Sequence, residues 1–202
     1  MAEGRTYHHG ALRQALIDGA KEILAERGHE QFSLNEVARR AGVSTAAPYR
    51  HFSNRDELLG AVAEEGYVAL AGKLENAGGL VRLGGVYVRF AHDNPGLFVT
   101  MFRRRPGGTE SAAGRAAFET LLRAIAAAQH SGEIATRASP EITARSVWAT
   151  LHGLAVLHQQ QPHDRYGLGG EPEELATTTL SALLGLKSDC GAPGDGHCDG
   201  SG

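Results

Sequence analysis

The amino-acid sequence predicts an all-α protein. Apolar residues recur at intervals of three and four along most of the 202-residue chain, which is the spacing that one buried face of a helix requires. No segment alternates apolar and polar residues like a strand for more than a few positions. The breaks between the periodic segments coincide with proline or glycine, at Pro95, at 106–108, at Pro140 and at 161–170. Because 42% of the residues are hydrophobic, the chain is able to bury a core.

Composition excludes several classes of protein. No stretch approaches the roughly 18 uncharged apolar residues of a membrane span, and the first ten residues lack the apolar core of a signal peptide. Both cysteines, Cys190 and Cys198, lie in a Gly/Asp-rich tail, which excludes a disulfide-built fold. We therefore expect a cytoplasmic protein without a membrane partner. The net charge of -3, from 20 basic and 23 acidic residues, gives no overall indication of nucleic-acid binding.

The first two helices have clear boundaries. Helical spacing of apolar residues extends from Gly10 to Arg27, after an arm at 1–9 that we expect to be flexible, and Gly28 suits a left-handed cap. Ser33 and Glu36 have the spacing of a capping box in front of a short second helix. Gly42 ends that helix.

The remaining helices follow in order. Ser44 is placed to cap a third helix from 45 to about 51, with Pro48 in its first turn, where a missing N–H costs least. Asn54 is placed to cap a fourth helix that runs towards Asn76. Further periodic segments span 80–92, 95–103, 110–130, 141–160 and 172–186, so we expect about nine helices. Residues 187–202 contain no large aliphatic side chain after the first position and should form a disordered tail.

The second and third helices have the layout of a helix-turn-helix reader of DNA. Their sequence, FSLNEVARRAGVSTAAPYRHF, spans about 32–52. From Val37 to Arg55 there are four arginines and no acidic residue, a local charge of +4. A small helical core with a solvated basic face is the alternative. The positions expected to be buried between the two helices are Leu34, Val37, Ala38, Val43, Tyr49 and Phe52.

Three segments, YHHGALR, STAAPYRHF and SNRDEL, closely resemble the TetR family of bacterial transcriptional regulators. The resemblance extends from about Tyr7 to Leu74, with departures at Ala46, where glycine is frequent, and at Pro48, where an aliphatic residue is usual. It implies a DNA-binding domain at 10–55, a connecting helix at 56–78 and a sensor and dimerisation domain at 79–186.

The same resemblance implies roles for individual residues. Positions matching Ser33, Thr45, Tyr49, His51 and Arg55 usually hold the phosphate backbone. Ser44, Thr45, Ala46 and Arg50 are candidates for contacts to bases, and a phosphate contact is the equal alternative for Arg50. Arg5, in the N-terminal arm beside His8 and His9, is placed to enter a minor groove. The two histidines are only a weak metal-ligand pattern, because adjacent residues of a helix point to different faces. Cys190, His197 and Cys198 in the tail are the other metal alternative, for an adventitious ion, and a polar tail is the favoured interpretation. We expect no metal, cofactor or catalytic residues.

The C-terminal segments VWATLHGLAVL at 147–157 and HDNPGLFVTMF at 92–102 resemble family members that carry a Trp-His-Gly signature. Their place in the family implies a domain that senses a ligand and dimerises. Aromatic and flexible side chains are candidates to surround a pocket for a small apolar effector, although plain core packing is the alternative reading. The pocket candidates are Phe90, Phe98, Met101, Phe102, Phe118, Leu121, Leu122, Trp148 and His152.

Small residues in the last two helices permit close approach to a symmetry mate or to each other. The combined expectation is a homodimeric, sequence-specific regulator, nucleoid-associated when bound, that a small molecule releases from a palindromic operator. The alternative is a DNA-binding module whose helical domain docks a protein partner. The sequence does not specify the operator, the effector, the regulated genes or the sign of regulation.

Overall fold

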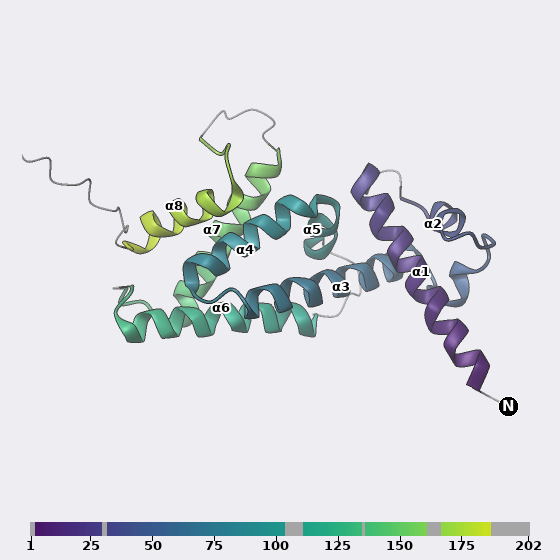
Figure 1. Ribbon diagram of the computed structural model, residues 1–202, viewed down its shortest axis with the longest axis horizontal. Coiled ribbons are helices and arrows are strands. Elements are labelled where there is room, and N and C mark those ends of the chain that lie inside the picture. The colour runs from purple at the N-terminus through teal and green to yellow at the C-terminus, as the bar shows by residue number, and fades with distance from the viewer. Residues whose placement is uncertain (1–2, 30–31, 104–110, 135, 161–166, 187–202) are drawn as a thin grey trace, which may run out of the picture.

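The computed structural model describes residues 3–29, 32–103, 111–134, 136–160 and 167–186, with side chains from residue 10 onwards. Within these residues it is entirely helical, which confirms the predicted fold class (Figure 1). Each of the eight α-helices lies within a few residues of a predicted helix or, for the first, extends it. The elements are α1 (Glu3–Arg27), α2 (Leu34–Arg40), the 3-10 helix η1 (Pro48–Arg50), α3 (Arg55–Glu75), α4 (Leu80–Asp93), α5 (Pro95–Phe102), α6 (Ala112–Ser131), α7 (Pro140–Gln160) and α8 (Pro172–Leu184).

Side-chain caps fix the starts of the helices near the N-terminus. Ser33 Oγ accepts a hydrogen bond from the Glu36 amide at 3.2 Å, and Asn54 Oδ1 accepts one from the Glu57 amide at 2.9 Å, as predicted. The Glu36 carboxylate binds the Arg39 guanidinium at 2.6 Å, so only the Ser33 half of the expected capping box forms. Local sequence thus predicts the cap residues. The Glu36 carboxylate, however, binds the nearby Arg39 guanidinium and not the backbone of the cap.

The structure corrects two local predictions. Helix α1 begins at Glu3 and not at Gly10, so the backbone of most of the expected N-terminal arm is helical. The predicted third helix is a turn followed by η1, because Pro48 has no N–H with which to bond the Ser44 carbonyl. That carbonyl accepts a hydrogen bond from the Ala47 amide at 2.9 Å instead, which tightens the segment to a three-residue repeat.

The described residues bury two hydrophobic cores. The smaller core joins α1, α2 and the start of α3, and the larger one joins α4 to α8 with the rest of α3. Helix α3 passes from one core to the other, with Val62 in the smaller and Leu70 in the larger. Four of the six positions predicted to be buried in the helix-turn-helix segment are buried, Val43 is half-buried, and Tyr49 is 56% exposed, so its assignment to the core was wrong.

Helix α5 is the second link between the two cores. Its Leu97 packs against both of them. The backbone at Gly96 lies so close to the end of α1 that an added Cβ would be 2.6 Å from the Leu24 carbonyl carbon and nearer still to its oxygen. Only glycine permits this approach. No helix among the described residues has the length and apolar character to cross a membrane.

Candidate DNA-binding surface and ligand cavity

The segment from Ser44 to Arg50 forms an exposed loop over the smaller core. Ala47 and Pro48 point inwards and are buried, and they anchor the loop. The side chains before and after these two residues are exposed to solvent. They are the ones that the sequence predicts to contact DNA. The exposed residues are Ser44, Thr45, Ala46, Tyr49 and Arg50.

The positive charge of this region is smaller than the sequence count indicates. Arg39 pairs with Glu36, and Arg40 binds the Glu26 carboxylate through two bonds of 2.5 and 2.7 Å. The bond to Arg40 lowers the pKa of Glu26, and that carboxylate remains ionised at neutral pH. Glu26 on α1 and Glu36 on α2 precede Val37 in the sequence, so the count of +4 from Val37 to Arg55 leaves them out. In the folded protein these two carboxylates balance part of that positive charge.

Arg55 and Arg50 have different surroundings. Arg55 Nη2 donates a hydrogen bond to the His29 carbonyl at 2.6 Å, and its guanidinium lies 5.5 Å from the centre of the Phe32 ring. It therefore fastens the connection between α1 and α2 to the start of α3. Arg50 is exposed and forms no ion pair with any described residue. Arg5, Arg50 and Arg55 were all assigned to DNA, and of the two whose side chains are described, Arg50 is the one with its charge turned to solvent.

Three further residues, Ser33, His51 and Arg5, were predicted to contact DNA. The Ser33 hydroxyl caps α2 and keeps its own proton for a further partner. His51 is half-buried beside Phe52, with ring centres 6.5 Å apart. The side chain of Arg5, like those of His8 and His9, lies outside the described residues.

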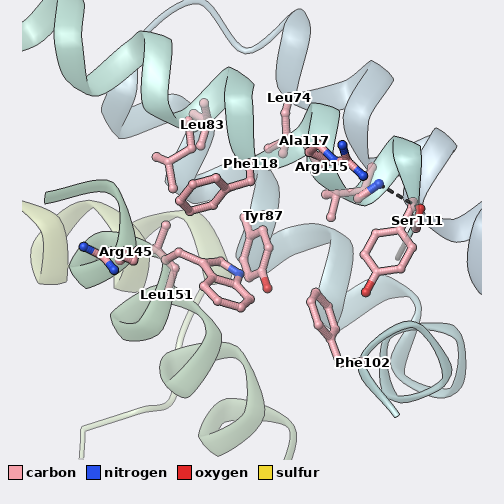
Figure 2. Close-up of a pocket in the computed structure, with 15 residues that line it drawn as sticks. Leu74, Leu83, Tyr87, Phe102, Ser111, Arg115, Ala117, Phe118, Arg145 and Leu151 are labelled. Atoms are coloured by element: carbon pink, nitrogen blue, oxygen red, sulfur yellow. Dashed lines mark hydrogen bonds between the residues drawn. The ribbon is translucent and has the colours of Figure 1, made fainter. Parts of the chain in front are cut away.

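The larger domain contains a cavity of about 430 Å³ between α3, α4, α6 and α7, with the end of α5 at one side (Figure 2). This volume is within the range of small-molecule sites. Four predicted residues line it, namely Phe102, Phe118, Leu121 and Trp148. The sequence did not indicate the lining residues of α3, and from α4 it suggested Phe90 where Leu83 and Tyr87 line the cavity. The described residues that line it are Tyr67, Leu70, Leu74, Leu83, Tyr87, Phe102, Ser111, Gly114, Arg115, Ala117, Phe118, Leu121, Arg145, Trp148 and Leu151.

The remaining pocket candidates do not line the cavity. Phe98 and Met101 are buried on other faces of α5, and Phe90 is buried in α4. His152 lies behind the wall, where its Nδ1 is 2.9 Å from the Tyr87 hydroxyl, and Leu122 is a half-buried residue packed on the core. Periodicity places all of these residues on apolar faces, but it does not say which side of each helix faces an empty space.

His152 connects several aromatic rings of the wall. Its ring centre is 4.5 Å from that of Phe102 and 6.0 Å from that of Trp148. Burial lowers the pKa of His152 and raises the pKa of Tyr87, so both groups are neutral at neutral pH. The histidine is thus a positioning residue that orients the Tyr87 hydroxyl.

Helix α5 joins this wall to the DNA-binding domain. Phe102 faces the cavity, while two residues earlier Thr100 Oγ1 is 2.7 Å from Nε2 of His29. The Thr100 hydroxyl donates to the Gly96 carbonyl at 2.7 Å, so the imidazole Nε2–H is the donor to Thr100. Burial, and to a smaller extent the charges of Arg103 and Arg55, lower the pKa of His29. One short helix therefore contacts both candidate sites.

Comparisons with known proteins agree with this architecture. Residues 16–62 match the family of bacterial regulatory proteins described as tetR family, and residues 80–183 match the tetracyclin repressor-like C-terminal domain. A solved structure from Rhodococcus sp. RHA1, described as a protein with unknown function, is 34% identical with a TM-score of 0.75 over 89% of this chain and 97% of its own.

A second similar structure is SmeT, the repressor of the Stenotrophomonas maltophilia multidrug efflux pump SmeDEF. It is 26% identical with a TM-score of 0.63, covering 84% of this chain and 89% of its own. SmeT has also been solved as a complex with triclosan, and that structure has the same fold as this chain, with a TM-score of 0.64. The two matched segments, the shared fold and the exposed helix-turn-helix loop lead to one conclusion: the chain belongs to the TetR family of bacterial DNA-binding transcriptional regulators.

Proposed function

We propose that the protein is a homodimeric repressor that leaves a palindromic operator when a small apolar molecule fills the cavity of the larger domain. The observation that carries the proposal is the position of α5. This helix contributes Phe102 to the cavity wall and Gly96 to the contact with α1. A ligand that displaces the last turn of α5 would therefore shift the helix against the DNA-binding domain.

The contact between α1 and α5 is closely packed. The Gly96 backbone lies against the Leu24 carbonyl, and the hydrogen bond from His29 to Thr100 joins α5 to the turn that follows α1. Packed backbone deforms little, so movement of α5 is expected to turn α1 rather than to be absorbed. A ligand that binds the shifted arrangement better than the DNA-bound one lowers the affinity for DNA by that difference in binding free energy.

The outer face of α7 supports the proposed dimer. With 100° of rotation per residue, Ile142, Ala149, Gly153 and Leu157 fall within one stripe, on a different side of the helix from Trp148. Ile142 is 50% exposed, Leu157 is 46% exposed and Gly153 has open space around it. Among the small residues of the last two helices, Ala155 and Ala176 are buried within the protomer and serve its own packing.

The exposed loop supports the proposed contact with DNA. Ser44, Thr45 and Ala46 are small enough for close approach to base edges, and Tyr49 and Arg50 are placed beside them for phosphate or guanine. In a dimer the two loops would enter successive major grooves about 34 Å apart. We further infer, from the VWATLHGLAVL segment, that the larger domain belongs to the Trp-His-Gly subgroup.

The test is selection of DNA from a random pool, followed by release of the selected operator with candidate ligands. Triclosan is a reasonable first ligand, since SmeT is known with it bound. Binding to the cavity is followed through Trp148, the only tryptophan of the chain. We expect a palindromic operator and saturable release. His152→Ala should weaken release without unfolding the protein, because His152 orients the wall but does not touch α1.

Three results would contradict the proposal. A folded dimer that selects no sequence would exclude specific DNA binding. Ligand binding that quenches Trp148 but leaves operator affinity unchanged would exclude the regulatory step. A panel with no bound ligand, together with a protein that co-purifies with the larger domain, would favour docking of a protein partner.

A further inference from the structure

We infer that His92 and His158 form a binding site for a divalent metal ion such as Zn²⁺, with His92 Nδ1 and His158 Nε2 as the two protein ligands. The site lies where the C-terminal ends of α4 and α7 meet. Neither histidine is among the described residues that line the cavity. The two are 66 residues apart in the sequence, so no spacing pattern indicated them. Imidazole nitrogen is a ligand that suits zinc, nickel and copper.

The two ring nitrogens are separated by nearly the distance that a shared ion requires. His92 Nδ1 lies 3.1 Å from His158 Nε2, and the two ring centres are 5.1 Å apart. With zinc–nitrogen bonds of about 2.0–2.1 Å and a tetrahedral angle, two ligand nitrogens lie about 3.4 Å apart. A movement of about 0.3 Å would therefore convert a hydrogen-bonded pair into a pair of ligands.

The His158 ring has the protonation that a metal ligand needs. Its Nδ1 lies 2.7 Å from the Leu168 carbonyl oxygen. A carbonyl only accepts hydrogen bonds, so Nδ1 carries the ring proton and Nε2 keeps its lone pair on the side of His92. Metal-binding histidines typically donate their other N–H to a carboxylate or a backbone carbonyl in this way. His92 is exposed, and the tautomer with its proton on Nε2 supplies the second lone pair.

A neighbouring contact holds the two helices together at this point. Gln159 Nε2 donates a hydrogen bond to the Ala91 carbonyl at 2.6 Å, so the residues next to both histidines are already joined. Ligands that are held in place before an ion binds lose less conformational entropy. The ion would add a second link between α4 and α7, which supply Tyr87 and Trp148 to the cavity wall.

The charges beside the pair favour a cation. Arg89 lies one turn before His92, but its guanidinium is bound by Glu171 and Glu173 at the start of α8. Hydrogen bonds from Arg89 lower the pKa of Glu173, and the charge of His92 adds a smaller effect in the same direction. An ionised carboxylate is therefore close enough to His92 to attract a cation there.

The coordination expected is open. The described part of the chain contains no cluster of three or more metal-ligating side chains. Two imidazoles with water in the other positions bind an ion less tightly than a closed structural site with four protein ligands. We therefore expect a reversible site that responds to the concentration of the ion.

Zinc binding to the full-length chain tests the inference. Cys190→Ser and Cys198→Ser are introduced into every protein, because the thiols of the tail are zinc ligands themselves. His92→Gln, His158→Gln and the double variant remove one or both ligands. His130→Gln is the matched control, because His130 is an exposed histidine of α6. Calorimetric titration with zinc chloride gives the affinity, and thermal unfolding with and without zinc gives the stability.

We expect the cysteine-free protein to bind zinc and each single histidine variant to bind it about tenfold or more weakly. The double variant should lose no more affinity than either single variant, because one imidazole alone does not form the two-ligand site. At a zinc concentration about 100 times the dissociation constant, the folding equilibrium constant should rise about 100-fold. This rise should be absent from all three variants and present in His130→Gln.

Three results would overturn the inference. Unchanged zinc affinity in His92→Gln, a substitution at an exposed position, would exclude the site. Small losses that add up in the double variant would indicate two independent surface ligands and an adventitious ion only. Zinc that lowers the unfolding temperature would indicate binding to the unfolded chain. None of these results bears on the proposed repressor function, which does not use either histidine.

Discussion

Gly96→Ala is the substitution that most directly tests the contact between the two domains. The new Cβ would lie 2.6 Å from the Leu24 carbonyl carbon and 3.3 Å from the Ala25 amide nitrogen. Both are backbone atoms inside a helix, so no side-chain rotation relieves the contact. Helices α1 and α5 would have to separate by about 1 Å to restore ordinary van der Waals distances.

The expected cost is about 1–3 kcal/mol of folding free energy, the usual range for overpacking. At about 2–4 °C per kcal/mol for a domain of this size, the melting temperature should fall measurably. Gly72→Ala is the matched control, because Gly72 is exposed within α3 and has open space around it. Alanine there should raise helix stability by up to about 1 kcal/mol.

The assay combines urea unfolding, followed by circular dichroism, with fluorescence anisotropy of the selected operator, each with and without ligand. We expect Gly96→Ala to lower the unfolding midpoint and to reduce operator affinity or its response to ligand. If Gly96→Ala matches Gly72→Ala in both stability and operator binding, the contact with Leu24 does not carry the coupling and the reasoning fails.

The other predictions concern DNA, pH and assembly. Arg50→Ala should weaken operator binding about tenfold, and Arg39→Ala should weaken it much less because Arg39 already pairs with Glu36. Equal losses of operator affinity, measured by fluorescence anisotropy, would contradict this expectation. Operator affinity should fall with salt at a slope near -4 on logarithmic axes, if about four counterions are released, and a flat dependence would exclude phosphate contacts. Because burial lowers the pKa of His29, the unfolded chain binds its proton first, so unfolding free energy should decline as pH falls below about 6.5. His29→Gln should make this decline shallower in urea titrations at several pH values, and an unchanged slope would refute the assignment. Leu157→Arg should give monomers in light scattering, because it introduces a charge into the proposed interface of α7, whereas Val68→Arg, at an exposed residue of α3, should leave the dimer intact. Dimers of both variants would show that the interface does not include Leu157.

Local sequence determined the helices and most of their ends. Ser33 and Asn54 cap the helices that follow them because a side-chain oxygen at that position satisfies an otherwise unpaired amide. Gly42 ends α2 with φ of 67°, a conformation that costs other residues more. Pro48 was correctly placed near a helix start, but the sequence did not reveal that its missing N–H would reduce the whole third helix to η1.

The sequence by itself therefore determined the all-α class, the helix-turn-helix segment and the aromatic character of the larger domain. Only the tertiary structure decided which groups meet. Arg40 is balanced by Glu26 on another helix, and the cavity brings Tyr67 of α3 beside Phe118 and Trp148. Phe98 and Phe102 are one turn apart on α5, yet one is buried in the core and the other faces the cavity. The physical reason is that caps and periodicity act over a few residues, whereas cavities and ion pairs depend on how distant helix faces pack.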